Sequence, residues 1–124
     1  MSGIGKRKIL LVDDDKDMCE SLSDVLSMDS EYNVSYTTSP LKALDKILTE
    51  NYSLIIIDYK MPEMNGIELL KRIKQHTTFP AVFILTAFIS NELIDQAKKE
   101  GAAKVLSKFI WPDEILKQIR ATIG

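Results

Sequence analysis

Residues 54–66 read Leu-Ile-Ile-Ile-Asp-Tyr-Lys-Met-Pro-Glu-Met-Asn-Gly, an apolar run that ends in Asp58 and passes into a polar turn. A short continuous apolar run is typical of a parallel strand that is covered on both faces. The same pattern occurs at residues 9–15, where Ile-Leu-Leu-Val is followed by three aspartates. If the two strands are parallel neighbours, their acids meet at one edge of one sheet. Such acids repel each other unless a cation or a proton lies between them.

Strand-like and helix-like segments alternate along the rest of the chain. A third apolar run covers residues 81–85, an alternating edge strand is expected at 32–36, and a short strand at 104–107. Apolar residues at helical spacing predict helices between and after these strands. We expect the following residues on the buried helix faces: Met18, Leu22, Val25, Leu26, Leu41, Leu44, Ile47, Leu48, Ile67, Leu70, Ile73, Leu93, Ile94, Ala97, Ile115, Leu116, Ile119 and Ile123.

This alternation predicts an α/β fold with a doubly wound, five-stranded parallel sheet and five helices on its two faces. Strand–helix–strand units within one sheet have parallel strands, and their crossovers are right-handed. The expected strand order is 2-1-3-4-5, with the first and third strands side by side. In such folds ligands bind at the carboxyl ends of the strands, beside the point where the order reverses. The acids occupy those ends.

The composition is typical of one ordinary globular domain. The chain has 124 residues, of which 45% are hydrophobic and 27% are charged. A net charge of −2 argues against nucleic-acid binding through bulk electrostatics. Cys19 is the only cysteine, which excludes an internal disulfide and a cysteine metal cluster. No apolar run approaches the ~20 residues of a membrane span. We therefore expect a cytoplasmic protein that binds neither a membrane nor nucleic acid directly.

The predicted strand ends carry the residue types that phosphoryl transfer uses. Two or three carboxylates can bind Mg²⁺ through oxygen, and one carboxylate can be the nucleophile that forms an aspartyl phosphate. The cation neutralises phosphoryl oxygens, a lysine adds positive charge, and a threonine hydroxyl donates one hydrogen bond. The strand-end residues are Asp13, Asp14, Asp58, Thr86 and Lys108.

These residues and their neighbours resemble the CheY-like receiver domain of two-component response regulators, which has a flavodoxin-like fold. The matching stretches are Ile-Leu-Leu-Val-Asp-Asp-Asp at 9–15, Ile-Ile-Ile-Asp-Tyr-Lys-Met-Pro-Glu-Met-Asn-Gly at 55–66, Leu-Thr-Ala at 85–87, and Gly101-Ala102 followed by Lys108. Each stretch is weak alone, but their order and their positions at strand ends are specific. The resemblance implies that residues 1–124 form a single receiver domain, with no effector domain in this chain.

The resemblance also implies how the acids work. Asp58 would accept a phosphoryl group from a histidine kinase, a phosphotransfer protein or a small acyl phosphate. Asp14, Asp58 and the backbone carbonyl of Lys60 would bind Mg²⁺ directly, and Asp13 would bind it through a water. Asp15 is expected at the start of the following helix, where a negative charge suits the helix dipole.

The implied function is a phosphorylation-controlled signalling switch and not an enzyme, beyond its own phosphoryl transfer and a slow self-dephosphorylation. Thr86 and Lys108 would bind the phosphoryl oxygens. A downstream effector would dock on the face formed by the fourth helix, the fifth strand and the fifth helix.

Two residues depart from the family pattern near this face. Phe109 follows Lys108 where the family usually has proline, and a cis bond before a non-proline residue costs ~3–4 kcal/mol. We therefore expect a trans bond, a changed loop path, and a Lys108 side chain displaced from the site in the resting state. Val105 stands where the family usually has Tyr or Phe, and its stiff, small side chain provides no ring that could swing inward.

The loops beside this face carry five large apolar residues, which we expect to pack against the helix starts. A docking patch for a partner is the alternative, because large exposed apolar patches mark interaction sites. These residues are Phe88, Ile89, Phe109, Ile110 and Trp111.

Two other functions stay open at this point. The departures at Val105 and Phe109 would suit a degenerate receiver that binds a partner constitutively, although its acids are intact. A Mg²⁺-dependent phosphatase with an aspartyl nucleophile usually has a second aspartate two residues after the first. Lys60 stands there instead, and the chain has no cap segment for selecting a substrate.

Overall fold

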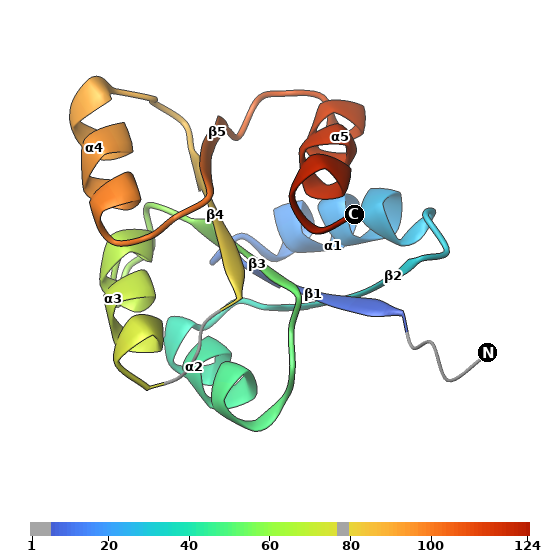
Figure 1. Ribbon diagram of the computed structural model, residues 1–124, viewed down its shortest axis with the longest axis horizontal. Helices are drawn as coiled ribbons and strands as arrows, with labels where there is room; N and C mark the ends of the chain where they lie inside the picture. The colour runs from blue at the N-terminus through green and yellow to red at the C-terminus, as the bar shows by residue number, and fades with distance from the viewer. Residues whose placement is uncertain (1–5, 77–79) are drawn as a thin grey trace.

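The computed structural model describes residues 6–76 and 80–124, and the strands and helices in these residues alternate strictly (Figure 1). The strands are β1 (Arg7–Val12), β2 (Tyr32–Thr37), β3 (Leu54–Asp58), β4 (Ala81–Thr86) and β5 (Lys104–Ser107). The helices are α1 (Lys16–Ser27), α2 (Pro40–Thr49), α3 (Gly66–His76), α4 (Asn91–Lys99) and α5 (Pro112–Ile123).

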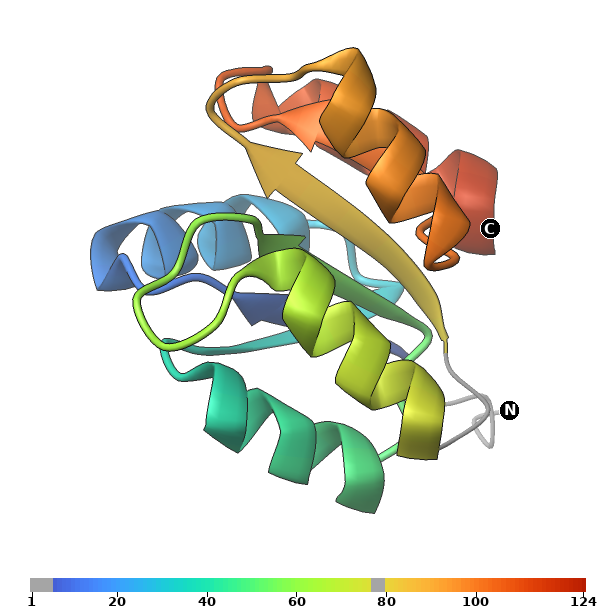
Figure 2. The ribbon, with the colours of Figure 1, turned by 90° about the vertical axis from the view of Figure 1, so that its left-hand side faces the viewer.

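The strands form one parallel sheet in the order β2-β1-β3-β4-β5. Helices α2, α3 and α4 cover one face, and α1 and α5 cover the other (Figures 1 and 2). The predicted fold class and strand order are therefore confirmed. The first and third strands lie side by side at the centre, so the loops after them open at the same edge.

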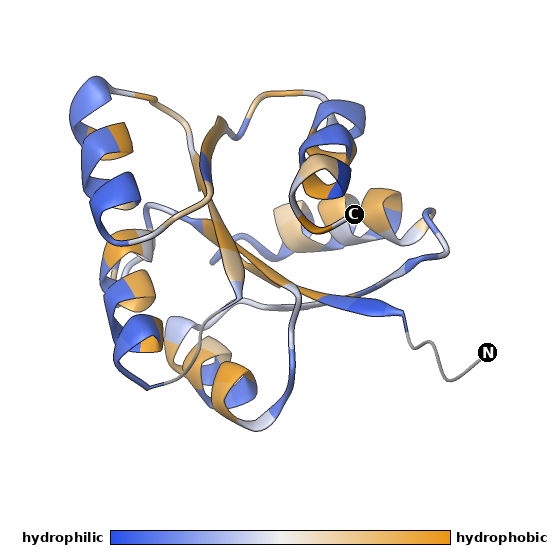
Figure 3. Ribbon diagram, viewed as in Figure 1, coloured by the Kyte–Doolittle hydropathy of each residue, from blue (hydrophilic) through white to orange (hydrophobic). Residues whose placement is uncertain are grey.

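The apolar runs of the central strands have no polar alternation because both faces of the sheet are covered. Successive residues of β1 point to opposite faces, so Leu10 packs with α2 and α3 while Leu11 packs with α1 and α5. Residues 55 and 56 of β3 divide in the same way. Figure 3 shows this arrangement as hydrophobic strands inside and helices whose outer faces are hydrophilic.

Local signals explain where several helices begin and end. Asp15, Ser39 and Ser90 each accept a hydrogen bond from the backbone N–H three residues further on, as N-cap residues do. The prediction that Asp15 starts a helix is confirmed. Gly101 follows α4 with φ = 96°, a left-handed conformation that glycine adopts without strain. Within residues 6–76 and 80–124, no helix is long and apolar enough to cross a membrane.

The prediction of which α2 residues are buried is partly wrong. Leu41 and Leu48 are 50% and 46% exposed, whereas Ala43 and Ile47 are buried and Leu44 is half-buried. Leu41 and Leu48 lie outside the part of the α2 surface that the sheet covers. The small side chain of Ala43 lets the covered part of α2 approach the sheet closely. Five other residues predicted to face inward are half-buried, namely Met18, Val25, Ile94, Leu116 and Ile123.

Candidate functional site

Three carboxylates converge at the carboxyl edge of the sheet. Val12 pairs with Ile57 in the parallel register of β1 and β3, so Asp13 and Asp58 lie at the same level on neighbouring strands. One carboxylate oxygen from each of Asp13, Asp14 and Asp58 lies within 4.8 Å of the others. The prediction that these acids meet is confirmed.

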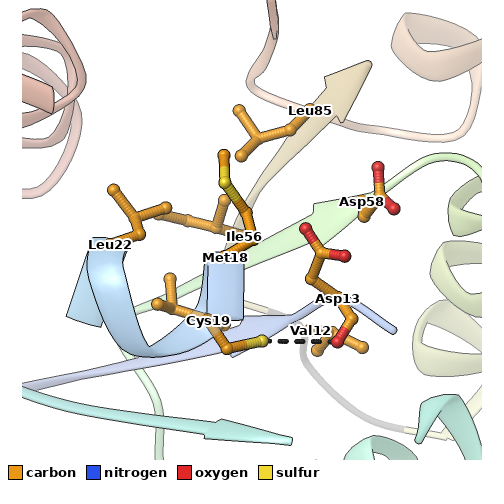
Figure 4. A pocket seen from close by; sticks show the side chains of 9 residues that line it. Val12, Asp13, Met18, Cys19, Leu22, Ile56, Asp58 and Leu85 are labelled. Carbon is orange, nitrogen blue, oxygen red and sulfur yellow. Dashed lines mark hydrogen bonds between the residues drawn. The ribbon is translucent and has the colours of Figure 1, made fainter. Parts of the chain in front are cut away.

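The three acids differ in their surroundings. Asp58 and Asp13 are 4% and 6% exposed, whereas Asp14 is exposed. Asp13 Oδ1 accepts a hydrogen bond of 3.0 Å from the backbone N–H of Asp15, which fixes its carboxylate. A cavity of about 10 Å³ lies beside Asp13 and Asp58, which is about the space that one water needs (Figure 4). The site therefore joins two buried acids to a third that faces solvent.

Lys108 places its ammonium group among these acids. Its Nζ lies 3.1 Å from Asp13 Oδ2 and 3.3 Å from Asp58 Oδ1. The bond between Lys108 and Phe109 is trans, as predicted. The expectation that Lys108 would be displaced is wrong. Its backbone N–H donates to the carbonyl of Thr86 at 2.9 Å, which continues the β4–β5 pairing by one residue and aims the side chain at the acids.

The charges of this cluster are strongly coupled. Burial, and then the negative charge of Asp13, raise the pKa of Asp58 from its ordinary value of 3.8 to about 6, although Lys108 opposes the rise. Burial alone would lower the pKa of Lys108, but its hydrogen bond and ion pair with Asp13, followed by those with Asp58, raise it instead. The site holds more negative charge than one lysine neutralises.

This surplus of negative charge predicts how the free energy of unfolding depends on pH. Between pH 4 and about pH 6 the folded chain keeps a proton on Asp58 that the unfolded chain has released, so stability falls as pH rises through this window. Above about pH 6 the free energy of unfolding stays lower by the full amount, on the order of 3 kcal/mol. Urea unfolding of the wild type and Asp58→Asn without metal ions measures the difference, because the variant lacks this titration. Parallel pH profiles for the two proteins would contradict the prediction.

Thr86 is buried at the end of β4, next to the acids in the sheet, but its hydroxyl is turned to the β4–α4 loop. Thr86 Oγ1 accepts a hydrogen bond from the N–H of Phe88 and lies 3.2 Å from the carbonyl oxygen of Phe88, to which it can donate. In this conformation the hydroxyl is engaged with its own loop. Its predicted contact with a phosphoryl group stays a prediction.

The loop after β3 is tightly folded around Asp58. A Cβ on Gly66 would lie 2.8 Å from the backbone oxygen of Asp58, so this position requires glycine. Asn65 caps α3 by accepting a hydrogen bond of 2.9 Å from the N–H of Glu68. Lys60 lies in this loop with an exposed side chain. The predicted use of its backbone carbonyl as a metal ligand stays a prediction.

Cys19 also lies at this site, although its sequence pattern alone did not predict this position. Its side chain is 1% exposed, and its Sγ donates to the backbone oxygen of Asp13 at 3.3 Å (Figure 4). Burial, and then the charge of Asp13, raise the pKa of the thiol to about 11, which keeps it protonated and unreactive. The sequence did contain a signal for the burial of Cys19, because Cys19, Leu22 and Leu26 follow the spacing of one helix face. Cys19 therefore helps to hold the backbone of the acid loop.

The exposed aromatic residues correct another expectation. Phe88, Phe109 and Trp111 are 86%, 79% and 82% exposed, so they do not pack into the helix starts. Ile89 is 48% exposed, and only Ile110 packs against the core between α1 and α5. Three large rings on the two loops beside the site are therefore free of the core.

This exposure predicts that Trp111→Ala leaves the free energy of unfolding within about 0.5 kcal/mol of the wild type, because the ring buries little surface and its side chain does not cap α5. The matched control is Ile115→Ala one turn later, where the side chain is 2% exposed and the loss should be about 2–5 kcal/mol. Urea denaturation measures both. A loss at Trp111 as large as that at Ile115 would contradict the exposed position.

The acid cluster fits a hard divalent cation. It offers only oxygen ligands, and carboxylates are the groups that Mg²⁺ and Ca²⁺ bind in proteins. The buried pair of Asp13 and Asp58 already draws in the ammonium of Lys108 as a counter-charge. A second positive charge at this edge would lower the remaining repulsion.

Comparisons with known proteins agree with this geometry. The family described as "Response regulator receiver domain" matches residues 9–120. The transcriptional regulatory protein CpxR homolog of Haemophilus influenzae is 38% identical over 118 residues, which are 94% of this chain and 50% of that protein. The sporulation initiation phosphotransferase F of Bacillus subtilis is 34% identical over 113 residues, which are 91% of this chain and 90% of that protein.

A solved structure has the same fold. The CheY-like response regulator receiver domain protein of Methanospirillum hungatei JF-1 is 27% identical, with a TM-score of 0.90 over 96% of this chain and 94% of that one. The chain spans about half the length of the Haemophilus relative and nearly all of the Bacillus one. Sequence, fold and the acid cluster agree: the chain belongs to the response regulator receiver domain family.

Proposed function

We propose that residues 1–124 act as one phosphorylation-controlled signalling switch in a two-component phosphorelay, with Asp58 as the phosphoacceptor. The observation that carries this proposal is the convergence of Asp13, Asp14 and Asp58 around the ammonium of Lys108 in a receiver-family chain. The intact acids favour this function over a constitutive binding module. Lys60, in place of a second aspartate, argues against a phosphatase.

Asp58 is the acid best suited to be the nucleophile. It is buried at the centre of the carboxyl edge, and the Lys108 ammonium lies 3.3 Å from one of its oxygens. A carboxylate oxygen of Asp58 attacks the phosphorus of a phosphohistidine, an O–P bond forms, and the P–N bond to the imidazole breaks. With an acyl phosphate, the P–O bond to the acyl group breaks instead.

Asp58 and the two other acids would hold the metal together. Asp14, Asp58 and the backbone carbonyl of Lys60 would be direct ligands, and Asp13 would hold a metal-bound water. When bound, Mg²⁺ would neutralise phosphoryl oxygens and reduce the repulsion among the carboxylates. Lys108 would then turn from Asp13 and Asp58 to a phosphoryl oxygen, and Thr86 would donate its hydroxyl proton to another. Each contact favours the phosphorylated conformation over the resting one.

The proposed partners follow from this chemistry. The donor would be a histidine kinase or a phosphotransfer protein, which must bring its phosphohistidine to the carboxyl edge of the sheet. The output would be an effector domain or protein that binds α4, β5 and α5 differently after phosphorylation.

The experiment that tests the proposal is incubation with Mg²⁺ and a small acyl phosphate, followed by intact-mass measurement and peptide mapping. We expect one added phosphoryl group per chain, located on Asp58. A protein that adds none, or adds it elsewhere, would contradict the proposal. Steady turnover of a generic phosphate ester would favour the phosphatase instead.

We predict that the phosphoryl group leaves slowly. Lys60 and Phe88 stand two residues after Asp58 and Thr86, and neither carries a carboxylate or an amide that could orient an attacking water. After the phosphodonor is removed, intact-mass measurements follow the decay of the phosphorylated form. Lys60→Asn, which adds an amide at this position, should shorten its lifetime. A wild-type lifetime of only seconds would refute this account.

A further inference from the structure

We propose that a groove between α3 and α4 binds a small phosphate monoester. Five residues line this α3–α4 groove, namely Ile67, Lys71, Gln96, Lys99 and Glu100. Its volume is about 210 Å³, whereas one water needs only about 10–15 Å³, so a small molecule has room there. None of the five residues belongs to the acid cluster, and the α3–α4 groove is therefore a separate site.

The two helices that form the α3–α4 groove are fixed to each other and to the core. Figures 1 and 2 show them next to each other on one face of the sheet. Lys74, in the last turn of α3, places its Nζ 3.1 Å from Oε1 of Glu100, which follows α4. Leu93 and Ala97 bury the inner side of α4 in the same core as Ile67, which is only 6% exposed. The walls of the groove are therefore in place before a ligand binds.

The α3–α4 groove carries a surplus of positive charge. Lys71 and Lys99 have exposed side chains, and neither belongs to an ion pair among residues 6–76 and 80–124. Glu100, the acid that lines the groove, is already neutralised by Lys74. Two ammonium groups, one from each helix, are therefore available to an anion.

These groups suit the head of a phosphate monoester. Such a phosphate carries roughly −1.5 to −2 charges at pH 7 and three acceptor oxygens, so its charge matches that of the two free ammonium groups. Lys71 and Lys99 can donate to it from opposite walls, and the amide of Gln96 can donate as well. A carboxylate carries only one negative charge and would match the groove less well. The organic part of the molecule would lie against the apolar side chain of Ile67.

A bound phosphate would tie α4 to α3 more firmly. It would contact both helices, in addition to the ion pair between Lys74 and Glu100. Because α4 belongs to the face on which we propose that an effector docks, the ligand would favour one conformation of that face. This consequence rests on the proposed function, whereas binding in the α3–α4 groove does not.

The test is a titration of ¹⁵N-labelled protein with glucose 6-phosphate at pH 7.5 without Mg²⁺, followed through the amide signals in NMR spectra. We expect saturable shifts centred on residues 67–71 and 96–100. Glucose lacks the charge, and glucuronate has one carboxylate in place of the phosphate. At equal ionic strength both should bind at least about fivefold more weakly. Asp58→Asn should bind the probe like the wild type, which separates this test from that of the phosphoacceptor.

Variants of neighbouring side chains decide whether the α3–α4 groove is responsible. Lys71→Gln and Lys99→Gln should each weaken the binding of glucose 6-phosphate by about fivefold. The matched controls are Arg72→Gln and Lys98→Gln, which remove exposed charges from the same helices but not from the lining of the groove. Their affinity should stay within about twofold of the wild type, because exposed charges outside the groove are screened by salt. An unchanged amide signal of the buried Phe83 shows that each variant is folded.

Four results would overturn the inference. Two concern the wild type: no saturable shift with glucose 6-phosphate, or shifts centred on the acid cluster instead of the α3–α4 groove. The third is an equal loss of affinity in the groove variants and in their controls, which would indicate diffuse attraction to a basic surface. The fourth is glucuronate binding as tight as that of glucose 6-phosphate, which would contradict the choice of a phosphate.

Discussion

Asp58→Asn is expected to abolish phosphorylation by a small acyl phosphate. The amide has no negative charge and cannot form the aspartyl phosphate, and the other buried acid beside Lys108, Asp13, already accepts a hydrogen bond from the N–H of Asp15. The substitution keeps the shape of the side chain, so the protein should remain folded. Intact-mass measurement over a time course compares the variant with the wild type under the same Mg²⁺ and donor concentrations.

The matched control is Asp15→Ala, two residues after Asp13 in the same acidic run. Asp15 accepts a hydrogen bond from the N–H of Met18 and caps α1, so its loss should lower stability by about 1 kcal/mol. Phosphorylation should persist. If Asp58→Asn still gained a phosphoryl group at the wild-type rate, or if Asp15→Ala lost it, the assignment of the phosphoacceptor would be wrong.

Lys108→Met is expected to change stability and metal affinity in opposite directions. Without metal ions, the ammonium of Lys108 is the counter-charge within 3.3 Å of both buried acids. Its removal leaves two carboxylates facing each other, which should lower the free energy of unfolding by about 3 kcal/mol or more. The same removal takes a positive charge from the site, so Mg²⁺ should bind more tightly. Mg²⁺ should therefore restore much of the lost stability.

Urea denaturation with and without Mg²⁺ measures both effects. The matched control is Lys104→Met on the same strand, because the side chain of Lys104 is exposed and belongs to none of the ion pairs found in residues 6–76 and 80–124. Its stability should change by less than about 0.5 kcal/mol, with no added dependence on Mg²⁺. A loss of stability in Lys108→Met that Mg²⁺ does not reduce would contradict the role of Lys108 as a counter-charge.

The sequence predicted the parts of the molecule that depend on chain pattern. Continuous apolar runs such as 9–12 and 54–57 gave the buried central strands, because a strand covered on both faces needs no polar alternation. Once the strands are parallel neighbours, their following acids must lie together. This is why the convergence of Asp13 and Asp58 could be predicted without coordinates.

What could not be predicted depends on side-chain reach and on surface exposure. Phe109 stands where the family usually has proline, which suggested that Lys108 would be displaced. The backbone hydrogen bond from Lys108 to Thr86 and the two ion pairs hold the ammonium in the site instead. The burial of Phe88 and Trp111 was expected from their hydrophobicity. The loops after β4 and β5, however, extend past the carboxyl edge of the sheet, where no helix in the described part of the chain covers them and the rings stay exposed.

The most direct test of the central claim is a calorimetric titration of the protein with Mg²⁺. We expect one ion per chain for the wild type, and an affinity at least about tenfold lower for Asp14→Ala, equivalent to about 1.4 kcal/mol. Asp14 is exposed, so this variant should stay folded. A wild-type protein that takes up no Mg²⁺, or an Asp14→Ala variant that binds it unchanged, would contradict the claim that Asp13, Asp14 and Asp58 share a single ion.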